Sequence, residues 1–327
     1  MMEKKEEIAF QLFSEFKSLS ELEEVFPNEQ SCVDYLEKIF WKGKTPISPF
    51  DPTSKVIKCA DQITKSKHPV KYTRYKCVNT GKYFNVRKWT VFESSNIPLR
   101  EWFRALYLFL SDKGGVPSCQ MSKIIGVTQP SAWFLLHRLR RGFDCPLFKT
   151  TLEGFVEADE TYLGGSNSNR HWDKKIPNSQ GRSCKDKIPI LVIIKRGGNV
   201  IAIVVPNVKR KTLEPIIRKY VKEGATVLTD EWLAYKGLSK WYNHGIVNHG
   251  KKQYVNGNAS TNTAESFNAC LKRGYGTYHW IKRKHAQSYV NEFSFRYNTR
   301  KYSEKERFDL ALSSLMGKRL TYQQLIS

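Results

Sequence analysis

The chain has 327 residues, 40% of them hydrophobic, which is enough for two or three domains with buried cores and unlike a disordered chain. No run of about 18 apolar residues occurs, so no membrane-spanning helix is expected. The excess of 54 basic over 31 acidic side chains predicts a polyanionic partner, with nucleic acid ahead of an anionic membrane surface, although a merely basic protein shares this charge. The seven cysteines are odd in number and lack a CxxC pair, which favours free thiols in a reducing cytoplasm.

The N-terminal part changes pattern near residue 45. Apolar residues at three- and four-residue steps predict two short helices between residues 5 and 42, in IAFQLFSEF and CVDYLEKIFW. From ISPFDPTSKVIKC to about residue 95, short alternating runs such as KYTRYKCV and KYFNVRKWTVF predict small antiparallel strands. We therefore expect N-terminal helices followed by a small β-rich module.

A helical region begins at Leu99. LREWFRALYLFLSD predicts one helix, and PSCQMSKIIGVTQPSAWFLLHRLRRGF predicts two more, the first ending at Gly126 and the second capped by Thr128. This is the outline of a helix-turn-helix, whose second helix can lie in the major groove of DNA, although an ordinary helical hairpin shares it. Because basic residues crowd the second helix, we predict that it contacts DNA.

Strands and helices alternate from residue 154 onward. GFVEADETY predicts a strand, KIPILVIIKR and GNVIAIVVPNV predict a hairpin about residues 197–199, and ATVLTD predicts a short buried strand. A helix in KRKTLEPIIRKYVKEG separates the hairpin from ATVLTD and is expected to end at Gly224. Further helices are predicted at about 262–273 and 284–299.

This order of elements predicts an α/β fold with an RNase H-like core built on a mixed sheet. A helical, helix-turn-helix region and the β-rich module come before it. The predicted organisation is N-terminal helices, β-rich module, helix-turn-helix region, catalytic α/β domain and C-terminal tail, at 1–45, 46–96, 97–150, 151–310 and 311–327.

Two predicted strands end in an acid, FVEAD at Asp159 and ATVLTD at Asp230. One such acid most often caps the next turn, but two at neighbouring strand ends can meet at one point. Like charges a few ångströms apart repel unless a cation lies between them, and Mg²⁺ takes carboxylate oxygens and leaves room for phosphates. Glu157, on the same strand face as Asp159, is expected to be structural or to support the ligands from behind, and Glu160 to face the other way.

A third acid lies on the predicted helix in STNTAESFNACLKRGYG. Glu265 and Lys272 are two turns apart on one helix face, and Asn262 is one turn before Glu265. A carboxylate and an ammonium on one face can serve a metal ion and a DNA phosphate respectively. Taken alone, this pattern is more typical of a solvated helix face.

Four separated segments resemble one known family closely and in the right order: VEADETYLGG, TDEWLAYKGL, NHGIVNHGKKQYV and STNTAESFNACLKRGYGTYHWIKRKHAQSYVNEFSFRYNTR. They are similar to the DDE transposases of bacterial insertion sequences of the fifteen-ninety-five family, whose catalytic part is called the ISXO-two-like domain. The resemblance covers about residues 85–310. It implies an RNase H-like core with an Asp, Asp, Glu (or Asn) triad and a downstream Lys, which fall here on Asp159, Asp230, Glu265 and Lys272, with Asn262 as the alternative third ligand.

The resemblance also implies a function. It implies a transposase that cleaves the ends of an insertion sequence and transfers the strands, with two Mg²⁺ or Mn²⁺ ions. Its partners would be double-stranded DNA (terminal inverted repeats and target) and at least one further copy of the chain, in the bacterial cytoplasm near the nucleoid, with no membrane. The alternatives are an inactive, domesticated DNA-binding regulator and a structure-specific DNA nuclease with the same core. The residues expected to hold DNA are Arg138, Arg140, Arg141, Lys272, Arg273, Lys282, Arg283 and Lys284.

The N-terminal module departs from the family pattern. Relatives usually carry a zinc ribbon with a CPxC pair and a YKCxxC pair, but this chain has SPFD at 48–51 and YKCVNT at 75–80. Structural zinc needs four good ligands, and Cys77 with Cys59 or His68 is too few. We therefore predict a zinc-ribbon-like module without zinc, held together by its aromatic residues Tyr75, Tyr83, Phe84 and Trp89.

Overall fold

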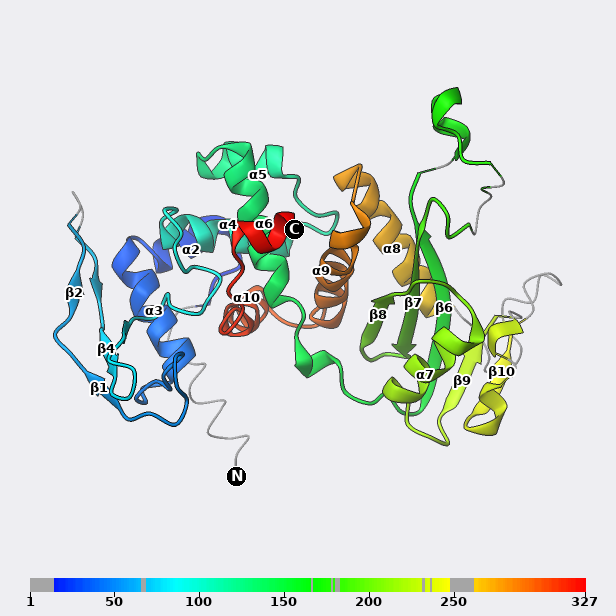
Figure 1. Ribbon diagram of the computed structural model, residues 1–327, viewed down its shortest axis with the longest axis horizontal. Helices are drawn as coiled ribbons and strands as arrows, with labels where there is room; N and C mark the ends of the chain where they lie inside the picture. Colours follow the sequence, from blue (N-terminus) through cyan, green and yellow to red (C-terminus); the bar gives the residue numbers. More distant parts are fainter. Residues whose placement is uncertain are drawn as a thin grey trace. The chain divides into compact units, whose positions relative to one another are not determined.

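The computed structural model describes residues 15–65, 69–165, 167–177, 179, 183–230, 233–235, 237–247 and 262–327. The chain forms two compact units (Figure 1). Unit 1 comprises Met1–Asp112, Val116–Phe143 and Tyr302–Ser327, and unit 2 comprises Lys113–Gly115 and Asp144–Lys301. The helix predicted in IAFQLFSEF lies mostly outside the described residues, as does His68.

Unit 1 combines helices with short strands. Its helices are α2 Leu19–Val25, α3 Glu29–Trp41, α4 Leu99–Ser111, α5 Ser118–Ile125, α6 Gln129–Gly142, α10 Glu304–Ser314 and α11 Tyr322–Ile326. Its strands are β1 Val56–Lys58, β2 Gln62–Ile63, β3 Lys71–Tyr72, β4 Tyr75–Cys77 and β5 Tyr83–Phe84. They pair antiparallel, as β1-β4-β5 and β2-β3, which confirms the predicted strand type.

The core of unit 1 is built around α4. Its N-cap is Pro98, which makes no side-chain capping bond, so the first turn takes a partner from elsewhere. The Glu29 carboxylate accepts the backbone N–H groups of Leu99 and Arg100 at 2.8 and 3.0 Å, which satisfies two helix-end donors and favours the helix dipole. Below this cap, the ring of Phe103 packs edge-on against Phe26 and Phe308, with centroids 4.9 and 5.5 Å apart.

The C-terminal residues complete unit 1. Phe308 lies on α10, and its ring also contacts Phe16 and Phe26 near the start of the described chain. Helix α10 therefore belongs to unit 1, whereas the predicted α/β domain extends to residue 310. The sequence around residue 302 does not mark this domain boundary. The boundary follows from the packing of Phe308 against Phe16 and Phe26, which are distant in sequence.

The predicted helix-turn-helix outline is present as α5 and α6. Helix α5 ends at Gly126, whose φ of +67° is the left-handed conformation that glycine adopts at low cost. Thr128 occupies the N-cap position of α6 but makes no capping bond to the backbone. Its hydroxyl instead bonds to that of Ser131 at 2.9 Å.

Unit 2 is built on a five-stranded mixed sheet. The strands are β6 Phe155–Leu163, β7 Ile188–Lys195, β8 Val200–Val204, β9 Thr226–Thr229 and β10 Asn243–Ile246, in the order β10-β9-β6-β7-β8. Strand β7 is antiparallel to both neighbours, and β9 is parallel to β6 and β10. The predicted hairpin and the mixed α/β sheet are thus confirmed.

Helices cover both faces of this sheet. Helix α7 (Arg210–Tyr220) packs with Leu213 and Ile217 against one face. Helices α8 (Asn262–Tyr278) and α9 (Ala286–Asn298) pack against the other. A Cβ on Gly274 would lie 1.8 Å from the Phe293 ring, so glycine permits the close approach of α8 and α9.

Two helices end at other residues than predicted. Helix α8 continues past the predicted end at about residue 273, to Tyr278. Helix α7 ends before Gly224, because Val221 is extended and bridges to Leu152. No helix in the described part of the chain is both long and apolar enough to cross a membrane.

Candidate active site

A cleft of about 810 Å³ lies beside β6 and α8 in unit 2. Its lining includes Asp159 from β6, Asp230 from the end of β9, and Glu265 and Lys272 from α8. The structure therefore brings together the four residues on which the family triad and lysine fall. Among the described residues that line this cleft, Asn262 does not occur.

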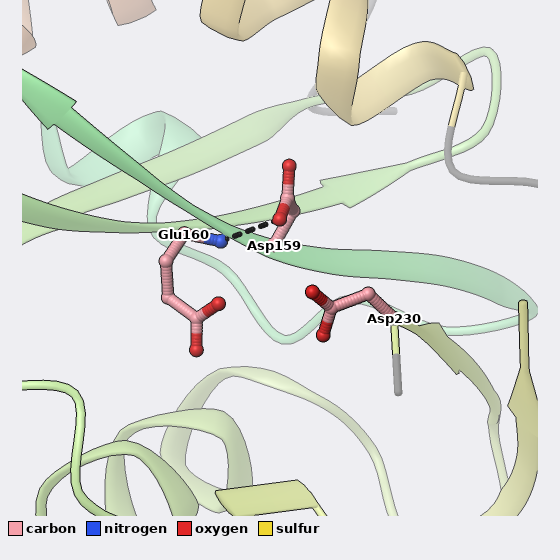
Figure 2. A group of neighbouring side chains, drawn as sticks. All are labelled: Asp159, Glu160 and Asp230. Atoms are coloured by element: carbon pink, nitrogen blue, oxygen red, sulfur yellow. Dashed lines mark hydrogen bonds between the residues drawn. The ribbon is translucent and has the colours of Figure 1, made fainter. Parts of the chain in front are cut away.

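Three carboxylates form the centre of the cleft. One oxygen each of Asp159, Glu160 and Asp230 lies within 4.8 Å of the other two, and Figure 2 shows the three side chains near one another, with the carboxylates of Glu160 and Asp230 turned toward each other. Glu265 lines the same cleft but is exposed and stands outside this group. The expectation that Glu160 faces away from the site is therefore wrong as regards its carboxylate.

The reason lies in the length of β9. The register pairs Glu157 with Leu228, and β9 ends one residue later at Thr229. Beyond that point, no strand among the described residues pairs with β6 on the β9 side. Alternation still directs Asp159 and Glu160 to opposite faces, but their side chains can meet around the uncovered edge, where Asp230 emerges.

Asp159 is oriented by two hydrogen bonds. Its Oδ1 accepts the backbone N–H of Glu160 at 2.8 Å (Figure 2), and its Oδ2 accepts Nδ2 of Asn268 at 2.8 Å. Asn268 is 6% exposed, and its Oδ1 has no hydrogen-bond partner among the described residues. Sequence reasoning missed Asn268, although it lies on the same helix face as Glu265 and Lys272.

Glu157 fastens α8 to β6. It is fully buried, and its carboxylate accepts the Arg196 guanidinium at 2.8 Å, the Thr263 hydroxyl at 3.0 Å and the Ala264 backbone N–H at 2.9 Å. It thereby caps the first turn of α8 and is matched by a cation. This confirms the structural role predicted for Glu157.

The two attachments of α8 have matching spacing. From Glu157 to Asp159 the strand advances about 6.6 Å, and from Ala264 to Asn268 the helix advances about 6 Å. Helix α8, once bound to Glu157 through Ala264, therefore brings Asn268 to Asp159 without distortion of the helix. The position of Glu265 and Lys272 relative to the strand acids is set by this pair of contacts.

Uncharged side chains lie near the other two acids. The Thr229 hydroxyl bonds to the Asp230 carbonyl and to Nε2 of His244, both at 2.9 Å, and burial lowers the pKa of His244, which favours its neutral form. Burial and then the charge of Glu160 raise the pKa of Tyr235 well above 10. Tyr235 therefore keeps its proton beside Glu160 and adds no charge to the cleft.

The arginines of α6 are not arranged as predicted. Arg138 is 6% exposed and donates to the carbonyls of Glu93 and Leu320 at 2.7 and 3.1 Å, and Arg140 is 1% exposed with its guanidinium over the Phe109 ring. Their burial contradicts the predicted DNA contact, because neither guanidinium faces solvent. Of the three, only Arg141 is exposed.

Other basic residues predicted to hold DNA do lie on the surface. Lys272 and Arg273 are exposed on α8, and Lys272 also lines the cleft. The remaining three, Lys282, Arg283 and Lys284, are exposed between α8 and α9. Their contact with DNA stays a prediction.

The module that resembles a zinc ribbon holds a polar cluster where the family has cysteines. Ser48 Oγ accepts the N–H groups of Phe50 and Asp51, both at 3.2 Å. Burial raises the pKa of the Cys77 thiol, but hydrogen bonds with Ser48, Ser54 and Thr80 outweigh it and bring the pKa to about 7. Hydroxyl groups thus surround the one cysteine that remains.

Comparisons with known proteins place this site in a family. Residues 151–298 match the family model described as "ISXO2-like transposase domain". An uncharacterised protein in transposable element ISH50 of Halobacterium salinarum is 25% identical over 300 residues, which are 89% of this chain and 98% of the relative. An uncharacterised transposase-like protein of Haemophilus influenzae is 33% identical over 100 residues, 30% of this chain and 80% of the relative.

Among solved structures, similarity is found to two Mos1 complexes. The Mos1 strand transfer complex is 12% identical with a TM-score of 0.26, over 67% of this chain and 78% of that chain. A pre-cleavage Mos1 transpososome is 14% identical with a TM-score of 0.23, over 66% and 78%. At these TM-scores the likeness supports no conclusion about fold or function. The family match and the transposase-like relatives agree with the motifs of the cleft, and this chain belongs to the family of ISXO2-like transposases.

Proposed function

We propose that unit 2 is an RNase H-like catalytic domain that cleaves DNA at the ends of an insertion sequence and joins those ends to target DNA. One observation carries the proposal. Asp159 and Asp230 converge in a cleft that Glu265 and Lys272 also line, inside the region that matches the transposase family. The mixed sheet with β7 as its antiparallel strand supports the RNase H-like assignment.

The donor set of the cleft fits hard divalent cations. Three carboxylate oxygens within 4.8 Å of one another repel each other strongly unless positive charge lies between them. Oxygen ligands of this kind suit Mg²⁺ or Mn²⁺. We assign Asp159, Asp230 and Glu265 as the ligands, with Glu160 as a further carboxylate close enough to contribute.

The chain's own residues would position the reaction. Asn268 and the Glu160 N–H hold both oxygens of Asp159 in place. Lys272 would bind a DNA phosphate at the rim of the cleft, two turns from Glu265. Divalent ions held by the carboxylates would lower the pKa of the attacking hydroxyl and stabilise the leaving oxygen.

The direct test uses the full-length protein with duplexes that carry the DNA flanking its gene. With Mg²⁺ or Mn²⁺, we expect nicks that leave 3′-hydroxyl groups at the element end, and joints to target DNA. Chelation of the metal should abolish both products and leave binding. End-specific binding without any cleavage would instead identify a DNA-binding regulator, and cleavage of branched DNA without preference for the ends a structure-specific nuclease.

The third ligand needs its own comparison. If Glu265 is the ligand, Glu265→Gln should slow cleavage far more than Asn262→Ala, because only Glu265 lines the cleft. Both positions are exposed on the first turn of α8, so neither change should alter folding. A larger defect in the Asn262 variant would reverse the assignment.

A further inference from the structure

The connection between β6 and β7 is much longer than their pairing needs. The strands are antiparallel neighbours, with Leu163 opposite Ile188, and a two-residue turn can join such strands. The chain instead uses residues 164–187. Loops longer than about 12–15 residues inside a domain are uncommon and are usually functional. Figure 1 shows part of this segment, residues 167–177, in green beyond the ends of β6 and β7.

The described tip of this connection, residues 167–177, is closed on itself. The Asn167 side chain donates to the Ile176 carbonyl at 2.9 Å and accepts the Ile176 N–H at 3.0 Å. Two short 3₁₀ turns, Asn167–Asn169 and Trp172–Lys174, lie between them. We call residues 167–177 the β6–β7 finger.

The finger displays an indole among cations. Trp172 is 79% exposed, the largest value for any large hydrophobic residue in the described chain. Arg170, Lys174 and Lys175 lie beside it in sequence, and the single acid, Asp173, bonds to His171. A solvent-exposed indole adds little to the stability of the fold. It buries apolar area only when a partner covers it.

The base of the finger is part of the catalytic cleft. Gly164 and Lys187, the first and last residues of the β6–β7 connection, both line the cleft that contains Asp159. Arg170 lies 3.9 Å from the buried carboxylate of Asp186, next to Lys187. Arg170 of the finger therefore lies close to the chain at the rim of the cleft.

We propose that the β6–β7 finger binds the DNA that enters the cleft, with Trp172 stacked on an unpaired base and the finger cations on the adjacent phosphates. This inference rests on the proposed function, since it takes DNA as the occupant of the cleft. Every base offers a π-face, so an exposed indole suits the unstacked bases of a DNA end without demanding a sequence. The finger cations add the attraction for phosphate that an apolar protein partner lacks.

The test compares two probes with the full-length protein. One is a duplex with a short single-stranded extension that carries 2-aminopurine, and the other is the same duplex with a blunt end. Wild-type protein should bind the extended probe more tightly and quench its fluorescence. Trp172→Ala should remove the quenching and weaken that binding about tenfold or more, Trp172→Phe should keep part of both, and the blunt probe should respond little.

Matched controls separate stacking from other effects. Phe155→Ala removes another exposed aromatic, at the opposite end of β6, and should leave quenching unchanged. Lys174→Ala with Lys175→Ala should flatten the salt dependence of binding by about two units and leave quenching in the bound state. Melting temperatures should not move, because the side chains of Trp172 and both lysines are exposed.

Three results are decisive. If wild-type protein binds neither probe, the proposed function fails and this inference with it. If wild-type protein binds and quenches while Trp172→Ala does the same, only the inference is overturned. If Trp172→Ala instead converts a DNA-free dimer to a monomer in sedimentation and leaves DNA binding intact, a second copy of the chain covers the finger, which also overturns it.

Discussion

Charges buried in unit 1 and charges gathered in unit 2 are arranged in opposite ways. In unit 1, Lys305 bonds to Asp309 at 2.8 Å on α10, Tyr35 donates to the same carboxylate, and all three are buried. In unit 2, Asp159, Glu160 and Asp230 place like charges together. Matched buried charges hold a fold in one arrangement, and breaking them is costly. The gathered acids of unit 2 repel one another within the fold, and such a group is typical of a site that holds a cation.

The same contrast occurs within one strand. Glu157 and Asp159 are two residues apart on the same face of β6. Glu157 receives a guanidinium, a hydroxyl and a helix N–H, whereas Asp159 receives one amide and one backbone N–H and opens on the cleft. The buried Glu157 supports the structure, whereas Asp159 lines the cleft, where a ligand can reach it.

The largest expected effect comes from removing one of the gathered acids. Asp159→Asn or Asp230→Asn should abolish cleavage and strand transfer, because each replaces a negative ligand by a neutral one of nearly equal volume. DNA binding should stay equal or become tighter. Without metal, the melting temperature should rise, because a like-charge repulsion is gone. Cleavage at the wild-type rate in either variant would sink the ligand assignment.

Breaking the matched group in unit 1 should have the opposite effect on stability. Asp309→Ala leaves Lys305 charged and buried without its partner, so urea unfolding should show a loss of about 3–5 kcal/mol. The pair replacement of Lys305→Met with Asp309→Leu should recover most of that loss. If Asp309→Ala cost no more than an average surface change, unit 1 would not depend on this group.

A smaller effect is expected from removing the Asn268 amide, which donates a hydrogen bond to Asp159. Asn268→Ala frees one oxygen of Asp159, so the Mn²⁺ concentration for half-maximal binding, measured by calorimetry, should rise about 10- to 100-fold. Asn298 is a matched control, since it is 7% exposed on α9 and bonds to the backbone of Val200. Asn298→Ala should lower the melting temperature and leave the Mn²⁺ requirement unchanged. Equal Mn²⁺ affinity in the wild type and the Asn268 variant would remove Asn268 from the site.

The smallest expected effects separate two arginines of α6. Arg138→Ala leaves two buried carbonyls without their donor and should cost about 1–3 kcal/mol of stability. Arg141→Ala should change stability by no more than about 0.5 kcal/mol, but should flatten the salt dependence of DNA binding by about one unit. An unchanged salt slope for Arg141→Ala would remove the remaining arginine of α6 from the DNA surface.

Local sequence patterns were enough to predict most of the helices and strands and the proximity of Asp159 and Asp230. Asp230 does follow the end of β9, as predicted, but β6 continues past Asp159 to Leu163, so the predicted strand end at Asp159 is wrong. The two acids meet because β9 ends beside the middle of β6. Glu160 could not be placed in this way, because its approach depends on where β9 stops relative to β6. The burial of Arg138 and Arg140 could not be predicted either. Arg138, for example, donates to the carbonyl of Leu320, which is distant in sequence. Periodicity describes a helix face but not its tertiary neighbour.

The division of unit 1 between two distant parts of the sequence has a consequence for synthesis on the ribosome. Unit 2 lies within Lys113–Gly115 and Asp144–Lys301, while Phe308, which packs against Phe16, Phe26 and Phe103, emerges only afterwards. At about 5–20 residues per second, the early aromatic residues wait on the order of ten seconds or more for this partner. All residues of the acidic cleft are therefore synthesised before the last part of unit 1. During that interval, we expect the aromatic residues that later pack against Phe308 to be the surface that chaperones shield.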